Sequence, residues 1–196
     1  MGDQTTKTAM MFTLRDAAAA DLPAITEIYR ESVLNGVATY EVTPPTEAEM
    51  MLRLTTITGS GYPYLAALDE RGVVLGYAYA SAFRTRTAYR FLVEDSVYLA
   101  PVARGKGIGR ALLEELVSRC TALGFRQMVA VIGGAHPSSI ALHRAVGFEH
   151  QGLMKATGFK HGRWLDTAIM QRPLGEGMDT PPTEGVYPDT LYRNAP

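Results

Sequence analysis

The stretch that most constrains this chain is residues 91–124, where a strand-like run, a glycine-rich turn and an amphipathic helix follow one another directly. Residues 91–99 have the apolar and aromatic content of a strand, and residues 104–109 read RGKGIG. The helix that follows ends near Gly124, and its apolar positions recur at helical spacing. Those positions are Leu112, Leu113, Leu116, Val117, Cys120 and Leu123. This succession places unpaired backbone N–H groups and the positive end of a helix dipole at residues 104–110.

A turn of this kind at the start of a helix is a place where proteins bind phosphate. Its spacing differs from a Walker loop, because no Gly-Lys-Ser/Thr ends it, and from the GxGxxG dinucleotide pattern. For the glycines alone, a tight structural turn is an equally good interpretation. Arg104, Lys106 and Arg110 favour a binding site, because three cations beside a helix N-terminus repel one another unless an anion lies among them.

Strand-like and helix-like segments alternate along the rest of the chain, separated by short breaker sequences. Asp21 and Pro23 mark the start of a helix that runs to about residue 34, and Thr46 and Glu49 have the spacing of a capping box. Besides the segments above, we expect strands over residues 12–15, 64–68, 73–83, 128–132, 148–156 and 164–172, and helices over residues 46–56 and 138–146. This order predicts an α/β (α+β) fold, a mixed sheet with helices on both sides.

The length of 196 residues fits one domain with modest extensions. Residues 12–174 hold all the expected elements, so we assign the domain to them. Residues 1–11 are polar, and residues 175–196 carry four prolines and three glycines without periodicity, so we expect both segments to be tails outside the core. Hydrophobic residues make up 46% of the chain and charged residues 20%, which rules out intrinsic disorder for most of it.

The formal net charge of −1 provides no overall field for nucleic acid or an anionic membrane, so an anionic ligand has to be held locally. Cys120 is the single cysteine and can form neither an internal disulfide nor a cysteine-rich zinc site, and no metal is expected. Residues 1–12 lack an apolar run long enough for a signal peptide or a membrane span. We therefore expect a cytoplasmic protein with no membrane partner.

Residues 104–109 resemble the Q/R-x-x-G-x-G/A pyrophosphate loop of the GNAT superfamily of acetyl-coenzyme A dependent N-acetyltransferases. Within it, the chain is similar to the phosphinothricin and methionine sulfone/sulfoximine N-acetyltransferases over about residues 14–172. The matching stretches are YRESV at 29–33, TYE at 39–41 with the prolines at 44 and 45, VEDSVY at 93–98, AVIG at 130–133 and GFKHGRW at 158–164. The resemblance implies the GNAT fold, a central mixed, mostly antiparallel sheet of about seven strands flanked by helices on both faces, and acetyl-CoA as the cofactor.

The resemblance also implies which residues hold the cofactor. The backbone of Val97 and Leu99 should pair with the pantetheine arm, and the amide near Leu99 should polarise the thioester carbonyl. His143 stands where many relatives place a tyrosine that assists the thiolate, although a histidine on such a helix face is more often structural. His136 replaces a common asparagine of this branch. The full predicted cofactor set is Val97, Leu99, Arg104, Gly105, Lys106, Gly107, Ile108, Gly109, Arg110, His136, Ser139 and His143.

Acetyl transfer requires a neutral amine, so a group must accept a proton from the substrate ammonium. Glu94 matches the carboxylate base of this branch, acting directly or through a water. Without the resemblance, a paired carboxylate at a strand end is the simpler interpretation. Asp95 points to the opposite face of a regular strand, so we do not expect the two carboxylates to act as a dyad.

The resemblance assigns recognition of an acidic acceptor to Arg84, Arg86 and Tyr89, and more firmly to the last two. The alternative is a solvated basic loop. Glu31, Tyr40 and Glu41 would form the opposite wall, and Leu92 stands where relatives often have threonine. These residues suggest a small amino-acid-like acceptor.

In this branch, segments similar to residues 155–164 help to build a two-fold dimer that closes the acceptor pocket, so we expect a homodimer. A surface hairpin is the alternative.

Two other functions remain open at the level of sequence. One is a GNAT acetyltransferase for another amine, such as a polyamine, an aminoglycoside or a peptide N-terminus, although the arginine pair disfavours a cationic acceptor. The other is a non-catalytic acyl-CoA-binding sensor, against which the retention of Glu94 beside an intact phosphate loop argues mildly.

Overall fold

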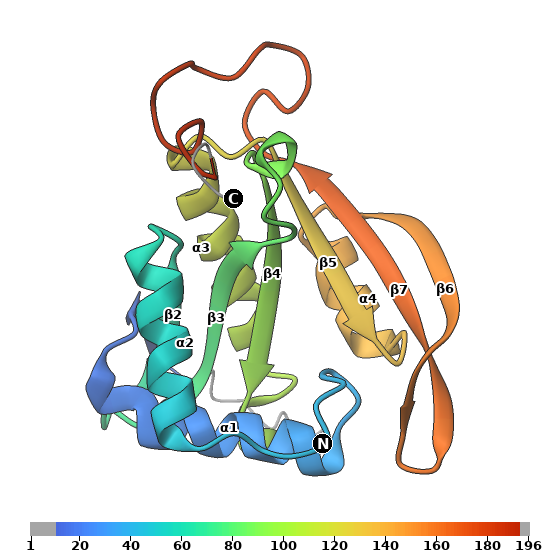
Figure 1. Cartoon of the computed structure of the whole chain (residues 1–196). Coiled ribbons are helices and arrows are strands. Elements are labelled where there is room, and N and C mark those ends of the chain that lie inside the picture. Colours follow the sequence, from blue (N-terminus) through green and yellow to red (C-terminus); the bar gives the residue numbers. More distant parts are fainter. Residues whose placement is uncertain (1–10, 193–196) are drawn as a thin grey trace, which may run out of the picture.

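The computed structural model describes residues 11–192 and is built on a seven-stranded sheet in the order β1-β2-β3-β4-β5-β7-β6 (Figure 1). The strands are β1 (Phe12–Asp16), β2 (Tyr64–Asp69), β3 (Val74–Ala82), β4 (Leu92–Leu99), β5 (Gln127–Gly133), β6 (Glu149–Lys160) and β7 (Arg163–Pro173). The helices are α1 (Leu22–Asn35), α2 (Glu47–Gly59), α3 (Ile108–Ala122) and α4 (Pro137–Ala145). Among the strand pairs of this sheet only β4 and β5 run parallel, which confirms the predicted mixed, mostly antiparallel sheet.

Helices cover both faces of the sheet, and the sheet divides the core into two parts (Figure 1). One part lies under α1 and α2 and includes Leu22, Ile25, Tyr64 and Tyr77. The other part contains the buried side of α3, where Leu112, Leu113, Leu116 and Cys120 are fully buried, as the helical spacing predicts. None of the helices within residues 11–192 is long and apolar enough to cross a membrane.

Of the two helix caps predicted from the sequence, the one at the start of α2 forms and the one at the start of α1 does not. Thr46 and Glu49 form the expected capping box at the start of α2, with Thr46 N donating to Glu49 Oε2 over 2.6 Å. Asp21 does not cap α1 with its side chain. Its carboxylate instead accepts hydrogen bonds from Arg15 over 2.7 and 2.8 Å and from Ala18 N over 2.8 Å. The Arg15 hydrogen bonds outweigh burial and hold the pKa of Asp21 below its usual value.

The last two strands are longer than the sequence predicts. β6 continues to Lys160 and β7 begins at Arg163, so only His161 and Gly162 form the turn. The pairing shifts register between Met154 and Gly158, and this irregularity interrupts the alternation that would have revealed one long strand. The resulting hairpin extends beyond the rest of the sheet at the lower right of Figure 1.

The described part of the C-terminal segment packs against the domain, which differs from the expectation of a tail outside the core. Asp189 is buried, and the Tyr187 ring packs edge-on against Phe125 with 5.6 Å between ring centroids. Leu191 also contacts the core. Single anchoring side chains separated by prolines and glycines have no periodicity, so a pattern-based prediction does not detect them. The N-terminal segment lies outside the described residues except for Met11.

Candidate active site

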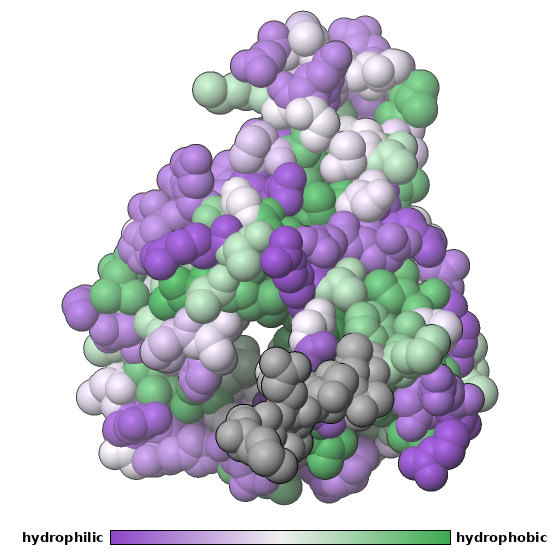
Figure 2. Space-filling model, turned by 180° about the vertical axis from the view of Figure 1, so that it is seen from behind, coloured by the Kyte–Doolittle hydropathy of each residue, from purple (hydrophilic) through white to green (hydrophobic). Residues whose placement is uncertain are grey.

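A cleft opens where β4 and β5 separate. The two strands pair only from Leu92 to Glu94 on β4 and from Gln127 to Val129 on β5. Farther along, β4 pairs with β3 as far as Leu99, and β5 pairs with β7 as far as Gly133. The cleft has a cavity volume of about 680 Å³. Seen from behind, the molecule is hollowed near its centre, where the ribbon shows the two strands apart (Figures 1 and 2).

The cleft brings together most of the residues predicted for the cofactor and the base. Its lining includes Glu94, Val97, Leu99, Arg104, Gly105, Gly107, Gly109, Arg110, His136, Ser139 and His143. The other predicted site residues lie outside this lining, and they are Glu31, Tyr40, Glu41, Arg84, Arg86, Tyr89, Lys106 and Ile108. The structure therefore groups the cofactor candidates closely but not the acceptor candidates.

The phosphate end of the cleft is formed by the turn between β4 and α3. Gly105 and Gly107 have φ angles of +70° and +84°, which side chains other than glycine rarely adopt. Gly107 caps α3 without a side-chain hydrogen bond, so the first amides of the helix stay available to a ligand. Arg104 is bonded to Glu31, and Arg110 to Glu114 over 2.8 Å. Uncapped amides next to exposed arginines fit an anion such as a pyrophosphate.

Ile108 and Lys106 take different positions in this turn. The Ile108 side chain is fully buried in the core, so only its backbone amide can contact a ligand. Lys106 is exposed and lies outside the lining of the cleft. At the phosphate end of the cleft, the positive charge in the lining therefore comes from Arg104 and Arg110.

Glu94 lies at the end of the cleft where β4 and β5 still pair. Burial is the main reason that its pKa rises to about 7, and the neighbouring charge of Asp95 adds to the effect. A carboxylate with a pKa near neutrality can accept a proton and release it again at the pH of the reaction. These surroundings suit a general base.

Asp95 and His143 form a buried pair beside Glu94. His143 Nε2 donates to Asp95 Oδ2 over 2.9 Å, and Nδ1 donates to the Ser139 carbonyl over 2.7 Å. Because both partners are acceptors, both ring nitrogens must carry hydrogen, so this geometry belongs to the charged imidazolium. Burial lowers the pKa of His143, but the Asp95 hydrogen bond and charge, with the Ser139 carbonyl, outweigh it and raise the pKa.

Sequence reasoning placed Asp95 on the face opposite Glu94 and gave it no role. In the structure its side chain is buried, lines the cleft and is bonded to His143, and its Oδ1 has no hydrogen-bond partner among the described residues. Strand alternation indicates the face on which Asp95 lies, but not the helix that packs there. Ser139 and His143 are four residues apart on α4, and this spacing in the sequence could have indicated that the two residues contact each other.

His136 and Ser138 mark the start of α4 at the rim of the cleft. His136 occupies the N-cap position without a capping bond, and its Nδ1 lies 2.8 Å from Ser138 Oγ. Both residues line the cleft, together with Ser139. His136 therefore contributes a polar ring to the rim of the cleft.

The predicted acceptor residues Arg84, Arg86 and Tyr89 are exposed on the connection between β3 and β4. The Arg84 guanidinium lies 5.2 Å from the centroid of the Phe83 ring, and Phe83 packs edge-on against Tyr89 at 6.0 Å. Glu94 follows Tyr89 by five residues. The group is therefore near the base in sequence and open to solvent.

The residues predicted for the opposite wall have other partners in the structure. Glu31 pairs with Arg104. The Tyr40 hydroxyl lies 2.7 Å from Thr167 Oγ1 and donates to the Asp166 carbonyl over 3.0 Å. The Tyr40 contacts tie the loop after α1 to β7, and the Glu31 contact joins α1 to the turn before α3.

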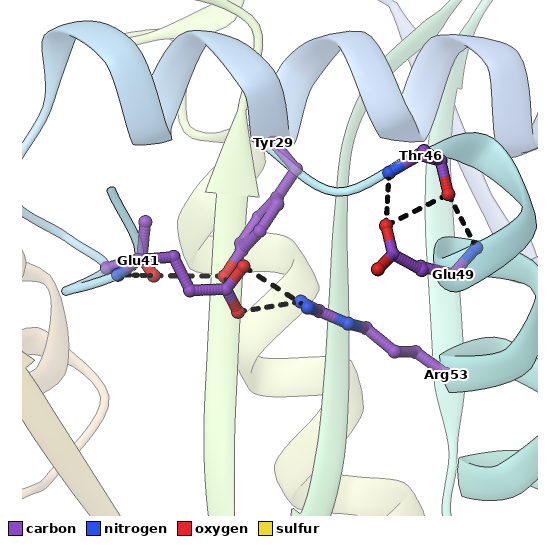
Figure 3. Close-up of polar contacts among 6 residues, drawn as sticks. Tyr29, Glu41, Thr46, Glu49 and Arg53 are labelled. Carbon is purple, nitrogen blue, oxygen red and sulfur yellow. Dashed lines mark hydrogen bonds and ion pairs between the residues drawn. The ribbon is translucent and has the colours of Figure 1, made fainter. Parts of the chain in front are cut away.

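Glu41 belongs to a polar network that fixes the same loop (Figure 3). Tyr29 donates to Glu41 Oε1 over 2.9 Å, and Arg53 on α2 pairs with the same carboxylate at 2.9 Å. The Tyr29 hydroxyl also lies 2.9 Å from Thr39 Oγ1. On the other side, buried Lys160 donates to the Thr39 carbonyl over 2.9 Å. Because Thr39 lines the cleft, these contacts hold one of its walls.

Comparison with known proteins shows the family to which this chain belongs. The Acetyltransferase (GNAT) domain family matches residues 14–169. A phosphinothricin N-acetyltransferase from Alcaligenes faecalis is 48% identical over 171 residues, which cover 87% of this chain and 86% of the relative. An L-methionine sulfoximine/L-methionine sulfone acetyltransferase from Pseudomonas aeruginosa is 42% identical over 172 residues, which cover 88% of this chain and all of the relative.

Among solved structures, the crystal structure of a GNAT superfamily phosphinothricin acetyltransferase from Sinorhizobium meliloti in complex with acetyl-CoA matches with a TM-score of 0.93. It is 84% identical, and the match covers 94% of this chain and all of the other. The chain belongs to the GNAT acetyltransferase family. It is an acetyl-CoA-dependent N-acetyltransferase, and its predicted resemblance to the phosphinothricin and methionine sulfoximine branch is confirmed.

The features of the cleft fit acetyl-CoA. The turn with positive φ angles and the uncapped start of α3 suit the pyrophosphate. The exposed backbone of β4, where β5 has turned away, suits an extended pantetheine arm. Within the described part of the chain, no group of three or more His, Cys, Asp or Glu side chains could hold a metal ion.

The turn at Gly107 generates a binding prediction. A Cβ at Gly107 would meet no atom within 4 Å, so the cost of Gly107→Val comes from its φ of +84° and from crowding of a ligand. We expect the variant to fold and to bind coenzyme A about ten- to a hundredfold more weakly, as for the loss of a charge-assisted hydrogen bond. Isothermal titration calorimetry measures the change.

The matched control is Gly72→Val in the β2–β3 turn, because Gly72 has a similar φ of +79° and equally open surroundings. It should lose stability without losing affinity for coenzyme A. An unchanged affinity in folded Gly107→Val would show that this turn does not hold the pyrophosphate.

Proposed function

We propose that this enzyme transfers the acetyl group of acetyl-CoA to the α-amino group of a small amino-acid analogue, like phosphinothricin or methionine sulfone and sulfoximine. The names of the two curated relatives support this acceptor class. The observation that carries the chemical part is Glu94, a carboxyl with a pKa of about 7 in the cleft. Transfer is direct, with Glu94 as the general base.

The proposed reaction begins with the acceptor ammonium next to Glu94. Bound acetyl-CoA supplies an activated acyl group with a thiolate as leaving group. Glu94 accepts a proton from the ammonium, so that the amine nitrogen has a free lone pair for attack on the carbonyl carbon. Its high pKa favours proton uptake, and its burial limits competition from water.

The backbone of β4 provides the second contribution. Val97 and Leu99 line the cleft at the part of β4 from which β5 has separated. We assign the amide near Leu99 as a donor to the oxygen that becomes negatively charged during attack. A preorganised donor of this kind stabilises the tetrahedral intermediate more than the ground state.

The third contribution concerns the coenzyme A thiolate. Both nitrogens of His143 are already bonded, which restricts direct donation from the ring. Ser139 lines the cleft, and its Oγ lies 3.4 Å from His143 Nδ1. We therefore assign the contact with the thiolate to the Ser139 hydroxyl, with His143 as the charged group behind it.

The acceptor end favours an acidic substrate over a cationic amine. Arg84 and Arg86 are exposed on the connection that leads into β4, ten and eight residues before Glu94. Two such guanidinium groups attract a carboxylate and a phosphinyl or sulfonyl oxygen, and they repel polyamines and aminoglycosides. The curated relatives are acetyltransferases, which sets aside the hypothesis of a non-catalytic sensor.

A homodimer is the assembly that the β6–β7 hairpin favours. Its exposed apolar side chains include Leu153, Met154, Phe159 and Trp164, and the last two are 59% and 66% exposed. The Phe159 and Trp164 rings pack edge-on at 5.3 Å and form one apolar surface. Clustered exposed aromatics are typical of interfaces, and a two-fold axis would bring two such hairpins together.

The role of Glu94 gives the test of the chemistry. We expect Glu94→Gln to lose about 10²- to 10⁴-fold in turnover while keeping its affinity for acetyl-CoA, because only the proton acceptor is removed. In the parent enzyme, kcat/KM should rise with pH through a midpoint near 7, since the base has to be ionised. This rise should be absent in the variant.

Glu70→Gln, in the exposed β2–β3 turn, is the matched control and should behave as the parent enzyme. Steady-state kinetics across pH provide the measurement. A Glu94→Gln enzyme within a few-fold of the parent at neutral pH would mean that another group is the base.

The acceptor class is tested with Arg86→Ala. The KM for methionine sulfone should rise about ten- to a hundredfold, the loss expected for one charge-assisted pair, while the KM for acetyl-CoA changes little. The decarboxylated amine of the same compound should respond weakly, because it lacks the acidic group. Arg71→Ala, another exposed arginine, is the control. Equal losses for both acceptors would assign Arg86 a structural role.

The dimer is tested with Trp164→Glu. A buried charge at the centre of an apolar interface is costly, so the variant should sediment as a monomer while the parent sediments as a dimer. Met178→Glu is the control, because Met178 is 91% exposed but lies outside the hairpin. A monomeric parent, or a dimeric Trp164→Glu variant, would contradict the proposal.

A further inference from the structure

The C-terminal segment is fixed to the domain at residues 186–192, which we call the C-terminal anchor. The Tyr187 ring packs against Phe125, and the Tyr192 hydroxyl is hydrogen-bonded to that of Tyr62. In Figure 1 this red segment curves over the end of the sheet from which β4 starts. One side of the anchor is thus held by side chains of the core.

The other side of the anchor holds the connection between β3 and β4. Asp189 Oδ1 accepts from Arg90 Nε and Nη2, each over 2.9 Å. Thr87 Oγ1 donates to the Tyr192 carbonyl over 2.9 Å, and Arg90 Nη1 donates to the Thr87 carbonyl over 2.9 Å. These contacts bind both ends of the short turn Thr87–Tyr89 to the C-terminal anchor.

The pair of Asp189 and Arg90 is well placed to act as a fixed point. The Asp189 side chain is 3% exposed and that of Arg90 is 25% exposed, so solvent screens the pair less than it screens a surface ion pair. Asp189 Oδ2 also accepts from Gly185 N over 2.7 Å, which orients the carboxylate. A charged pair with several directional bonds specifies one arrangement of the segments that it joins.

The β3–β4 connection, which these contacts hold, carries Arg84, Arg86 and Tyr89, and all three side chains are exposed. Its own backbone bonds include those from Tyr89 N to the Arg86 carbonyl and from Arg90 N to the Thr87 carbonyl. A connection with few internal bonds and exposed side chains has low local stability unless another segment holds it. The anchor lies beyond residue 169, where the shared acetyltransferase domain ends, so the family match gives it no role.

We propose that the C-terminal anchor is a positioning element for acceptor recognition, which acts by fixing the β3–β4 connection through Asp189–Arg90 and Tyr192–Thr87. The inference rests on the proposed function, in which that connection binds the acidic acceptor. Preorganising the connection reduces the entropy lost when the acceptor binds. None of residues 186–192 is part of the cleft lining, so we expect the effect of the anchor to be confined to acceptor binding.

The test compares Asp189→Asn with the parent enzyme. Amide hydrogen exchange over residues 84–91 should become faster, and the KM for methionine sulfone should rise about three- to thirtyfold. The KM for acetyl-CoA and kcat should stay within about twofold of the parent. Asp179→Asn, an exposed carboxylate of the same segment, is the matched control and should change neither readout. Thr87→Val removes the second contact without altering charge, and it should shift both readouts in the same direction.

Unchanged exchange at residues 84–91 in both variants would overturn the structural step. Faster exchange with an unchanged acceptor KM would overturn the functional step. A fall in melting temperature with equal changes in the KM for methionine sulfone and the KM for acetyl-CoA would show that the anchor only stabilises the whole domain. That result would also contradict the inference. A parent enzyme without turnover on any amino-acid analogue would instead refute the proposed function, and the exchange measurement would still report on the contacts.

Discussion

The rest of this structure depends on how β4 and β5 pair. The two strands run parallel over three residue pairs and then separate. Once the strands part, backbone groups of β4 face a cleft instead of a neighbour, and such groups are costly to bury unpaired. The turn and helix that follow β4 then place uncapped amides at one end of the cleft, and Glu94 lies at the other end. A linear cofactor with an anionic centre and a reactive tip fits this order of features.

Polar contacts from distant segments keep the cleft in shape. The Tyr29–Glu41–Arg53 network and Lys160 hold the wall at Thr39, and Asp95 with His143 joins β4 to α4. Asp95 also adds to the rise in the pKa of Glu94, so the pair links the geometry of the cleft to its proton chemistry. The charge on His143 balances that of Asp95, because a buried carboxylate without a counter-charge is unfavourable.

The cofactor end could be predicted from sequence because its parts are contiguous. Strand, turn and helix follow one another between residues 91 and 124, and the buried face of α3 is visible as periodicity. The acceptor side could not be predicted in the same way, because Glu41, Arg53 and Lys160 meet only after the sheet and helices have assembled. The same reason applies to Asp95, whose partner lies 48 residues away, and to Tyr187, whose packing follows no repeat. Tertiary contacts of this kind leave no periodic signal.

The central claim is that Glu94 is a base poised near neutral pH by its place in the cleft. A carbon-13 NMR titration of the side-chain carboxyls, with the Glu94 resonance assigned by its loss in a substituted protein, measures this directly. The account predicts a midpoint near 7 for Glu94 and a lower midpoint in Asp95→Asn, where the neighbouring charge is removed. A midpoint near the ordinary value of 4.5 in the parent enzyme would contradict it.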